Sequence, residues 1–404
     1  MATAGVPARS EVVVRSMTVA ALVVVGAVYL VYTWDRFVFS VELVEVRTAL
    51  GIPLGEAGLL ASIFTFGLAI VAIPAGFVVR RLGTRTVLVG GSVVFSLATG
   101  YTALGTGFGD VLVARVVTGV GEGLFNVALF TYLGSLSGRL RGTAVGIGAS
   151  LFGVGALTGP LVVAGMLSGS GDWRFAFLVL AGLGLVGAAA ILLTTRRSAA
   201  QPRELQARAR RPELKALLRL RLLPLAVLMA CNGVGLYGVV ALYETFLRVH
   251  HHFSLGAASV LFALNGAGNI VGGAPLGYLA DRVGRRRYLV ITSACAAVLG
   301  AALFLEPGWF ALSAVTAFAF GAASNSVYTN CYAVVQDEVE PEQAPLAVGA
   351  LATVYFLVAA GSGPLLIAAE SVFGWSVGGG VVYAAAYLVG FAAILTLKER
   401  TTSP

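Results

Sequence analysis

The chain has 404 residues, of which 58% are hydrophobic and only 11% are charged, and its formal net charge is +8. This composition excludes an ordinary soluble domain and predicts an all-α protein that crosses a lipid bilayer. The positive charge does not imply a nucleic-acid partner, because cytoplasmic loops that face anionic headgroups carry such an excess.

Twelve apolar segments are each long enough for the roughly 20 residues that a membrane-spanning helix needs. These segments are rich in Gly and Ala and lack the strict alternation of barrel strands, which favours helices. In chain order we expect the spans at about residues 17–40, 57–79, 86–106, 111–137, 142–166, 174–195, 222–248, 254–279, 288–305, 308–336, 344–368 and 376–397.

The basic residues predict the orientation of these spans. Most of the 27 Lys and Arg residues fall in alternate connections, on the side that also holds both ends of the chain. Positively charged loops stay in the cytoplasm. We therefore expect a multi-pass protein of the plasma (inner) membrane with both termini in the cytoplasm. The first apolar run is too long for a cleaved signal peptide and is expected to be the first span.

The second half of the chain repeats the first. Residues 74–85 match residues 275–286, and residues 159–161 match residues 363–365. Such a duplication predicts two pseudo-symmetric six-helix bundles with a site between them, which is a recurrent plan in transporters. The expected parts are an N-terminal bundle, a cytoplasmic linker and a C-terminal bundle, at residues 1–194, 195–221 and 222–404.

The repeated motif resembles the signature of the major facilitator superfamily, Gly-x3-Asp-Arg-x-Gly-x-Arg-Arg, between the second and third helices. The second copy fits every position, whereas Arg80 replaces the usual acid in the first copy. The resemblance implies the major facilitator fold with twelve transmembrane helices. It also implies a cytoplasmic gate whose charged residues pair across the bundle interface and with helix ends. The gate residues would be Gly76, Arg81, Gly83, Arg85, Gly277, Asp281, Arg282, Gly284 and Arg285.

Two predicted spans contain charged residues: Asp35 and Arg36 in the first, and Arg115 and Glu122 in the fourth. A charge in the middle of a bilayer costs roughly 3 kcal/mol, so such residues indicate a function. We expect Asp35 to contact Arg115, with Glu122 about 10 Å deeper on the same helix face. A carboxylate that exchanges an Arg partner for a proton can couple transport to protons. A static network of buried ion pairs is the alternative.

These charged segments resemble the anion:cation symporter branch of the superfamily, which includes carriers of sialic acid, sugar acids and organic phosphates. The resemblance is carried by residues 32–40 and 115–123. It implies that Asp35 and Glu122 are protonated during transport, with Arg115 as their partner, and that Arg36 binds a substrate carboxylate. The Pro that usually follows the Gly-Glu pair is absent. Spinster-type lipid transporters share the Asp-Arg and Gly-Glu pairs.

Other features of the sequence favour different roles. Gly146, Gly155 and the Gly159-Pro160 pair resemble the antiporter motif of proton-driven efflux pumps. We expect Glu244 to form a surface pair with Arg248. Amide and phenol side chains of the C-terminal half could bind solute hydroxyls or join helices. These candidate substrate residues are Asn232, Tyr237, Asn265, Asn269, Asn325 and Tyr328.

The sequence lacks the motifs of a membrane enzyme, such as HExxH, a Cys–His arrangement or a nucleotide-binding loop. It therefore predicts a monomeric transporter without cofactor or metal, whose partners are a small-molecule substrate, protons and the lipid bilayer. The favoured function is proton-coupled symport of a small organic anion by alternating access. The alternative is proton-antiporting efflux of amphipathic compounds or lysolipid-like molecules.

Overall fold

The computed structural model describes residues 8–134, 138–195, 222–339 and 343–397, and among them it contains helices and no strand. The helices before residue 196 are α1 (Ala8–Val41), α2 (Leu43–Leu50), α3 (Leu54–Ser62), α4 (Phe64–Ala72), α5 (Pro74–Leu82), α6 (Thr84–Leu104), α7 (Phe108–Gly134), α8 (Gly138–Ser170) and α9 (Trp173–Thr194). The later helices are α12 (Leu223–Val249), α13 (Leu255–Gly272), α14 (Ala274–Val283), α15 (Arg285–Leu305), α16 (Phe310–Glu338), α17 (Ala344–Ala359) and α18 (Ser362–Leu395).

Eleven helical stretches of the described residues are long and apolar enough to cross a membrane. The last of them, Leu346–Leu395, has 50 residues, which is more than twice the length that one crossing needs. Within it, Gly374 has a φ of 74° and interrupts the helical conformation. A side chain would disfavour this φ, so glycine permits the chain to turn there. This stretch therefore covers two of the predicted spans, and the prediction of a twelve-span all-α membrane fold is confirmed.

The two halves break their second spans at equivalent places. In the first half, α5 follows α4 after a break at Ile73, with Pro74 as its first residue. In the second half, α14 follows α13 after Gly273, with Pro275 in its first turn. A proline lacks the N–H that would continue the preceding helix, so it is tolerated at the start of a new one. The repeated sequence thus produces a repeated backbone shape.

A matching contact supports the pseudo-symmetry. Arg85 at the start of α6 donates a hydrogen bond to the carbonyl oxygen of Leu192, near the end of α9. Arg286 at the start of α15 donates to the carbonyl oxygen of Leu395, at the end of α18, over 3.1 Å. A cation at the C-terminal end of a helix is favourable because unpaired carbonyls and the helix dipole lie there. In both halves, the same motif arginine thus binds the last helix.

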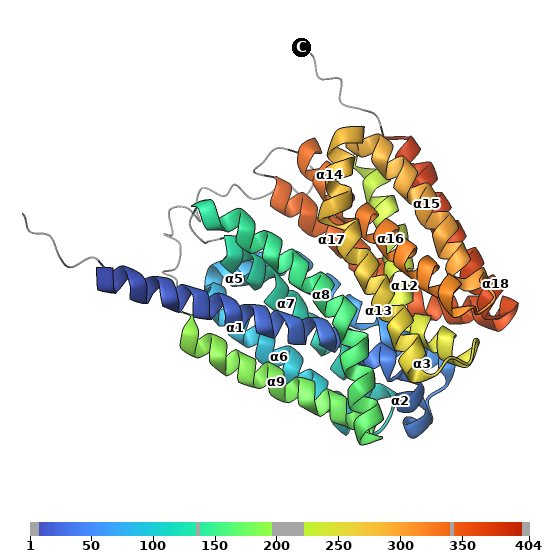
Figure 1. The fold of residues 1–404 in the computed structure, drawn as a ribbon, viewed down its shortest axis with the longest axis horizontal. Helices are drawn as coiled ribbons and strands as arrows, with labels where there is room; N and C mark the ends of the chain where they lie inside the picture. The colour runs from blue at the N-terminus through green and yellow to red at the C-terminus, as the bar shows by residue number, and fades with distance from the viewer. Residues whose placement is uncertain (1–7, 135–137, 196–221, 340–342, 398–404) are drawn as a thin grey trace, which may run out of the picture.

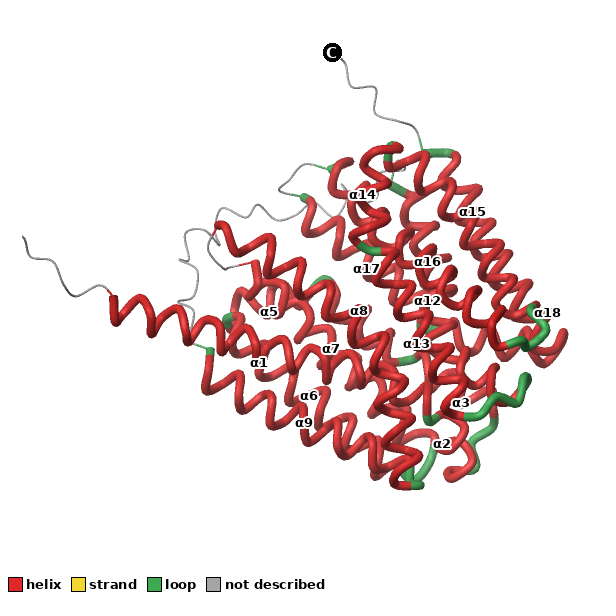
Figure 2. The backbone as a smooth tube through the Cα atoms, viewed as in Figure 1, coloured by secondary structure: helices red, strands yellow, loops and turns green. Residues whose placement is uncertain are grey.

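The halves meet at one end of the molecule and diverge at the other. Figures 1 and 2 show the first half (blue to green in Figure 1) approaching the second near α2 and α3, while α5 and α14 lie far apart. We call the end that holds α2 the outer end and the opposite end the inner end. The helix pairs that pack across the halves are α1–α12, α3–α12, α3–α18, α4–α17 and α8–α13.

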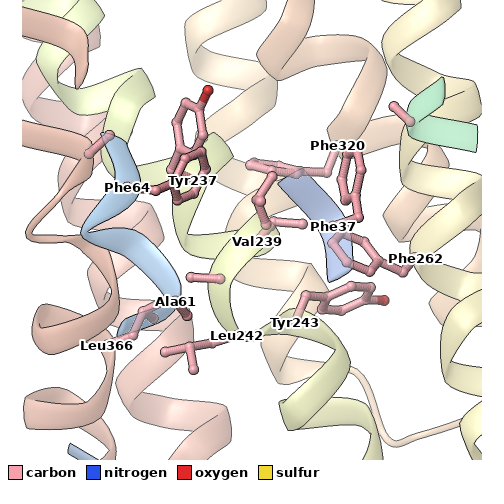
Figure 3. Packing of buried hydrophobic residues seen from close by; sticks show 14 of the residues in the cluster. Phe37, Ala61, Phe64, Tyr237, Val239, Leu242, Tyr243, Phe262, Phe320 and Leu366 are labelled. Carbon is pink, nitrogen blue, oxygen red and sulfur yellow. The ribbon is translucent and has the colours of Figure 1, made fainter. Parts of the chain in front are cut away.

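The outer contact between the halves is tight. The hydroxyl of Ser62 on α3 donates to the carbonyl oxygen of Ala360 over 2.7 Å. A Cβ added to Gly363 would lie 1.9 Å from the carbonyl oxygen of Gly58, so only glycine allows this approach. Deeper in the interface, aromatic rings of the two halves meet edge to face. These are Phe37 with Phe262 and Phe64 with Tyr237, as Figure 3 shows.

Candidate functional site

The adjacent residues Asp35 and Arg36 point in different directions from α1. Consecutive residues of an α-helix are rotated by about 100° because one turn takes 3.6 residues. As a result, Asp35 faces α6, where its Oδ1 accepts a hydrogen bond of 2.7 Å from the hydroxyl of Thr99. Arg36 faces α7 and α12. Both side chains are buried, with Asp35 0% and Arg36 6% exposed.

Arg36 joins the two halves of the protein. Its Nε donates to Glu122 Oε2 of α7 over 2.8 Å, and this contact is a buried ion pair. One terminal nitrogen donates to the hydroxyl of Tyr237, on α12 of the other half, over 3.1 Å. The other terminal nitrogen donates to the hydroxyl of Tyr32, one turn earlier on α1. A guanidinium has five N–H groups, so one N–H on each terminal nitrogen remains for a further acceptor.

The two buried acids interact with each other. The side chains of Asp35 and Glu122 are close enough for a hydrogen bond if one of them carries a proton. Asp35 Oδ2 and Glu122 Oε1 have no hydrogen-bond partner among the described residues. Two carboxylates in such proximity repel each other when both are charged. The arrangement can therefore hold a proton between two helices of the same half.

The expected contact between Asp35 and Arg115 is wrong. Arg115 is buried on α7, and its Nε donates a long hydrogen bond of 3.4 Å to the carbonyl oxygen of Leu60. Its guanidinium lies over the rings of Phe39 and Phe64, at 4.8 and 4.7 Å from their centres. Among the described residues, the ion pair of this cluster joins Arg36 and Glu122 instead. The sequence placed Arg115 at a suitable depth, but the helix rotation directs its side chain towards α3.

Most candidate amides of the C-terminal half join helices. Asn232 accepts a hydrogen bond from Tyr387 on α18, and Asn265 donates to the carbonyl oxygen of Ala317 on α16. Asn325 of α16 donates to the carbonyl oxygen of Asn269 on α13. The amide nitrogen of Asn232 and the amide oxygen of Asn269 lack partners among the described residues. Of this set, the structure places only Tyr237 in contact with the charged cluster.

An aromatic group surrounds Tyr237 on the C-terminal side. Its ring packs against Tyr355 and Phe356 of α17, with centroid distances of 5.7 and 5.9 Å. The ring centroid of Tyr328 on α16 lies 5.0 Å from that of Tyr355 and 4.8 Å from that of Tyr332. The predicted substrate residue Tyr328 therefore belongs to the same aromatic group as Tyr237.

The gate motif residues lie at the inner end and pair within their own halves. Arg285 contacts Asp281 at 3.0 Å and Asp337 of α16 at 3.2 Å. Arg282 donates to Tyr278 in the preceding turn. The expected pairing with helix ends is present at Arg85, but the described gate residues make no ion pair across the halves. The remaining gate positions, on α5 and α14 or at their ends, are Gly76, Arg81, Gly83, Gly277 and Gly284.

The expected surface pair of Glu244 and Arg248 is also wrong. Glu244 is 1% exposed, and its Oε1 accepts a hydrogen bond of 2.8 Å from Ser259 on α13. Arg248 binds both carboxylate oxygens of Glu45 on α2 and the carbonyl oxygen of Val41. This ion pair joins the two halves at the outer end. The sequence gives no distance between Glu45 and Arg248, so the pair could not be predicted.

Sequence reasoning gave no role to three residues of this region: Tyr32, Thr99 and Glu42. Tyr32 precedes Arg36 by one helical turn, and this spacing was a usable signal. Thr99 is an ordinary polar residue of an apolar span, and nothing in the sequence relates it to Asp35.

No group of three His, Cys, Asp or Glu side chains in the described parts of the chain could hold a metal ion.

Comparisons with known proteins agree with this fold. The family model of the Major Facilitator Superfamily matches residues 25–364. The chain therefore belongs to this superfamily of membrane transporters and is not an enzyme. Its multi-pass architecture and its small-molecule transport role follow from that membership.

Individual relatives are distant. The chain is 26% identical to the "Probable sulfoacetate transporter SauU" of Cupriavidus necator over 314 residues, which cover 72% of each protein. It is 29% identical to the "Hexuronate transporter" of Bacillus subtilis over 157 residues, and this match spans only 36% of that relative and 38% of the chain. A crystal structure of a D-xylose-proton symporter has the same fold, with a TM-score of 0.76 and 17% identity over 95% of this chain and 99% of that one.

Proposed function

We propose that this transporter is a proton-coupled symporter of a small organic anion, which works by alternating access. The observation that carries the proposal is the position of Arg36, which is hydrogen-bonded to Glu122 in one half and to Tyr237 in the other. Because Arg36 contacts both halves, an anion bound to it would be enclosed when the halves close around it and released when they separate. The sulfoacetate and hexuronate relatives support the proposal, because both named solutes are organic anions.

The mechanism follows from the unused N–H groups of Arg36. A substrate carboxylate would accept hydrogen bonds from one N–H on each terminal nitrogen, which is the paired geometry that arginine favours. The anion would use N–H groups that Glu122 leaves free, but its charge would neutralise the guanidinium that stabilises the Glu122 carboxylate. A proton on the Asp35–Glu122 pair would then replace the lost stabilisation. Anion binding and proton binding would thus favour each other, as symport requires.

The topology completes the proposal. We infer that residues 1–194 and 222–404 move as two bundles and that 195–221 connects them; apart from Thr195, the connector lies outside the described residues. The outer end would face the outside of a plasma (inner) membrane, with both termini in the cytoplasm and a monomer as the working unit. Arg115 would hold α7 against α3 and contribute positive charge near both acids.

Uptake into proteoliposomes tests the proposal. The probes are radiolabelled glucuronate, galactonate and sulfoacetate, each with and without an inward proton gradient. We expect gradient-driven accumulation of at least one anion, its loss in Arg36→Ala, and its uncoupling from the gradient in Asp35→Asn and Glu122→Gln. Glu56→Gln, which changes an exposed carboxylate of α3, is the matched control. Full gradient-driven uptake by both acid variants would contradict the proton role.

The efflux alternative rests on the Gly-rich seam of α8, which contains Pro160 within the helix and packs against α13 of the other half. Glycines and a proline at such a seam permit helices to slide or bend. If the protein exports amphipathic compounds instead, Arg36→Ala would leave solute recognition unchanged. Cells that express the chain would then resist amphipathic drugs, and this resistance would disappear in Glu122→Gln.

A further inference from the structure

A second pair of buried acids lies at the outer end, outside the Arg36 cluster. Glu42 follows the last residue of α1, is 0% exposed, and neither of its carboxylate oxygens has a hydrogen-bond partner among the described residues. Glu244 of α12 is 1% exposed and has one partnered oxygen, which accepts from Ser259, while Oε2 lacks a partner. The two residues belong to opposite halves. A charged carboxylate without partners is very costly to bury, so these positions suit groups that carry a proton.

The groups around Glu42 are mostly acidic. Glu45 of α2, Asp172 from the connection between α8 and α9, and Glu244 of α12 all act on it. Arg248 acts on Glu244, and its guanidinium is committed to Glu45. Burial, followed by these three carboxylates, raises the pKa of Glu42 to about 9. With the outer end closed, Glu42 therefore carries a proton at neutral pH.

Residues beside Glu42 contact the other half of the protein. Arg248 of α12 binds Glu45 and the carbonyl oxygen of Val41, and both of these residues lie close to Glu42 in the chain. If α12 moved away from α1 and α2, water would reach this segment and Glu244 would no longer approach it. In water a glutamate has a pKa near 4.3. Closing the outer end thus requires a proton that the opened end does not hold at neutral pH.

Glu42 also lies in line with the central acids. It follows Asp35 by seven positions, which places both on one face of the helix about 10 Å apart. The outer pair of acids is therefore distinct from the Arg36 cluster.

We propose that Glu42, together with Glu244, forms a second proton-binding site, which takes up a proton from the outer solution when the outer end closes and returns it when that end opens. The site deepens the proposed function and rests on it in one respect, namely that the outer end faces the acidic side. Acid outside would then favour the closed outer end, which is the direction that proton-driven import requires.

The expected pH dependence follows from linkage. Because closure raises the pKa of Glu42, the closed arrangement binds more protons than the open one at every pH between the two pKa values. The ratio of closed to open molecules should therefore fall about tenfold per pH unit from about pH 5 to 9 for one linked proton. This slope is a property of the protein alone and needs no substrate.

Distance measurements between spin labels test the proposal. The labels are attached at Thr48→Cys on α2 and Val372→Cys on α18, both exposed, in a full-length chain in nanodiscs. The three native cysteines are changed to serine, namely Cys231, Cys295 and Cys331. Between pH 5 and 9, we expect the population with a long distance to grow as pH rises. Glu42→Gln mimics the protonated acid and should remove at least most of this dependence and keep the outer end closed.

Glu56→Gln is the matched control, because Glu56 is an exposed carboxylate of α3 near the same end. It should retain the native slope. Glu244→Gln should reduce the slope if the two acids share the site. A native chain whose distance distribution does not change with pH would overturn the proposal, whatever the variants do. An unchanged slope in Glu42→Gln would overturn it equally.

The same measurement distinguishes this site from the proposed function. Asp35→Asn and Glu122→Gln leave Glu42 intact, so both should retain the pH-dependent slope. If these variants also keep full gradient-driven uptake, the central proton role fails while the outer site stands. If they lose coupled uptake but the native chain shows no slope, the symporter proposal stands and the outer site fails.

Discussion

Replacing Gly363 by alanine should open the outer end of the protein. A Cβ at this position would lie 1.9 Å from the carbonyl oxygen of Gly58 and 3.0 Å from the hydroxyl of Ser62. Backbone atoms cannot rotate away as a side chain can. Helices α3 and α18 would therefore have to separate by about 1.5 Å to reach the 3.4 Å of an ordinary contact.

The free-energy cost has two sources. Forcing extra atoms into a packed contact costs about 1–3 kcal/mol. The hydrogen bond from Ser62 to Ala360 at 2.7 Å would also lengthen, and such a bond contributes about 0.5–1.5 kcal/mol. A total of about 3 kcal/mol applies only to the closed arrangement, because α3 and α18 belong to different halves. The closed-to-open ratio should therefore fall by roughly 100-fold, since each 1.4 kcal/mol is a factor of ten.

The spin labels at Thr48 and Val372 measure this ratio directly. The matched control is Gly361→Ala, two residues earlier, where a Cβ would make only an ordinary contact of 3.5 Å with Val358. The control should keep the native distance distribution. If Gly363→Ala gives the same distribution as the control, the close packing of α3 on α18 does not hold the outer end shut, and the reasoning is refuted.

Three further predictions concern single contacts. Tyr237→Phe removes an acceptor of the Arg36 guanidinium, and such a bond contributes about 1.5–3 kcal/mol. The apparent melting temperature should therefore fall, and the less firmly held guanidinium should raise the KM for the transported anion about tenfold in uptake assays. Glu45→Gln breaks the partly exposed ion pair across the halves. The ratio of closed to open molecules should then change by no more than about fivefold, and this change should disappear at 1 M salt. Burial lowers the pKa of His251 despite the nearby Glu306 carboxylate. The native chain should therefore lose stability as pH falls below about 6.5. His251→Gln should reduce the drop in melting temperature between pH 7 and pH 5.

The fold could be predicted because its determinants are local or repeated. The lengths of the apolar segments predicted the spans, and the repeated segments 74–85 and 275–286 predicted two equivalent halves. Arg85 and Arg286 then make the same contact with a helix end, as their equivalent positions suggest. The boundaries differed by a few residues because Ile73 and Gly273 interrupt helices that the apolar pattern joins.

The sequence predicted which residues form the charged site but not which of them pair. Burying charges is costly, so Asp35, Arg36 and Glu122 were identifiable from composition alone. Which of them pair depends on the rotation of α1 about its axis and on the approach of α7, and the sequence fixes neither to within one residue. The ion pair with Arg36 rather than Arg115 is a consequence of that rotation. Glu42 was missed because it lies at a predicted span end, where a carboxylate is ordinarily solvated.

Protons bound by Asp35 and Glu122 should cross the membrane together with the substrate. The most direct measurement records the internal pH of proteoliposomes with a trapped dye while a transported anion is added outside, in the native chain and in Glu122→Gln. We expect the interior of native vesicles to acidify in step with anion uptake, and the variant to take up or exchange the anion without acidification. Equal acidification by the variant, or anion uptake by the native chain with no pH change, would contradict it.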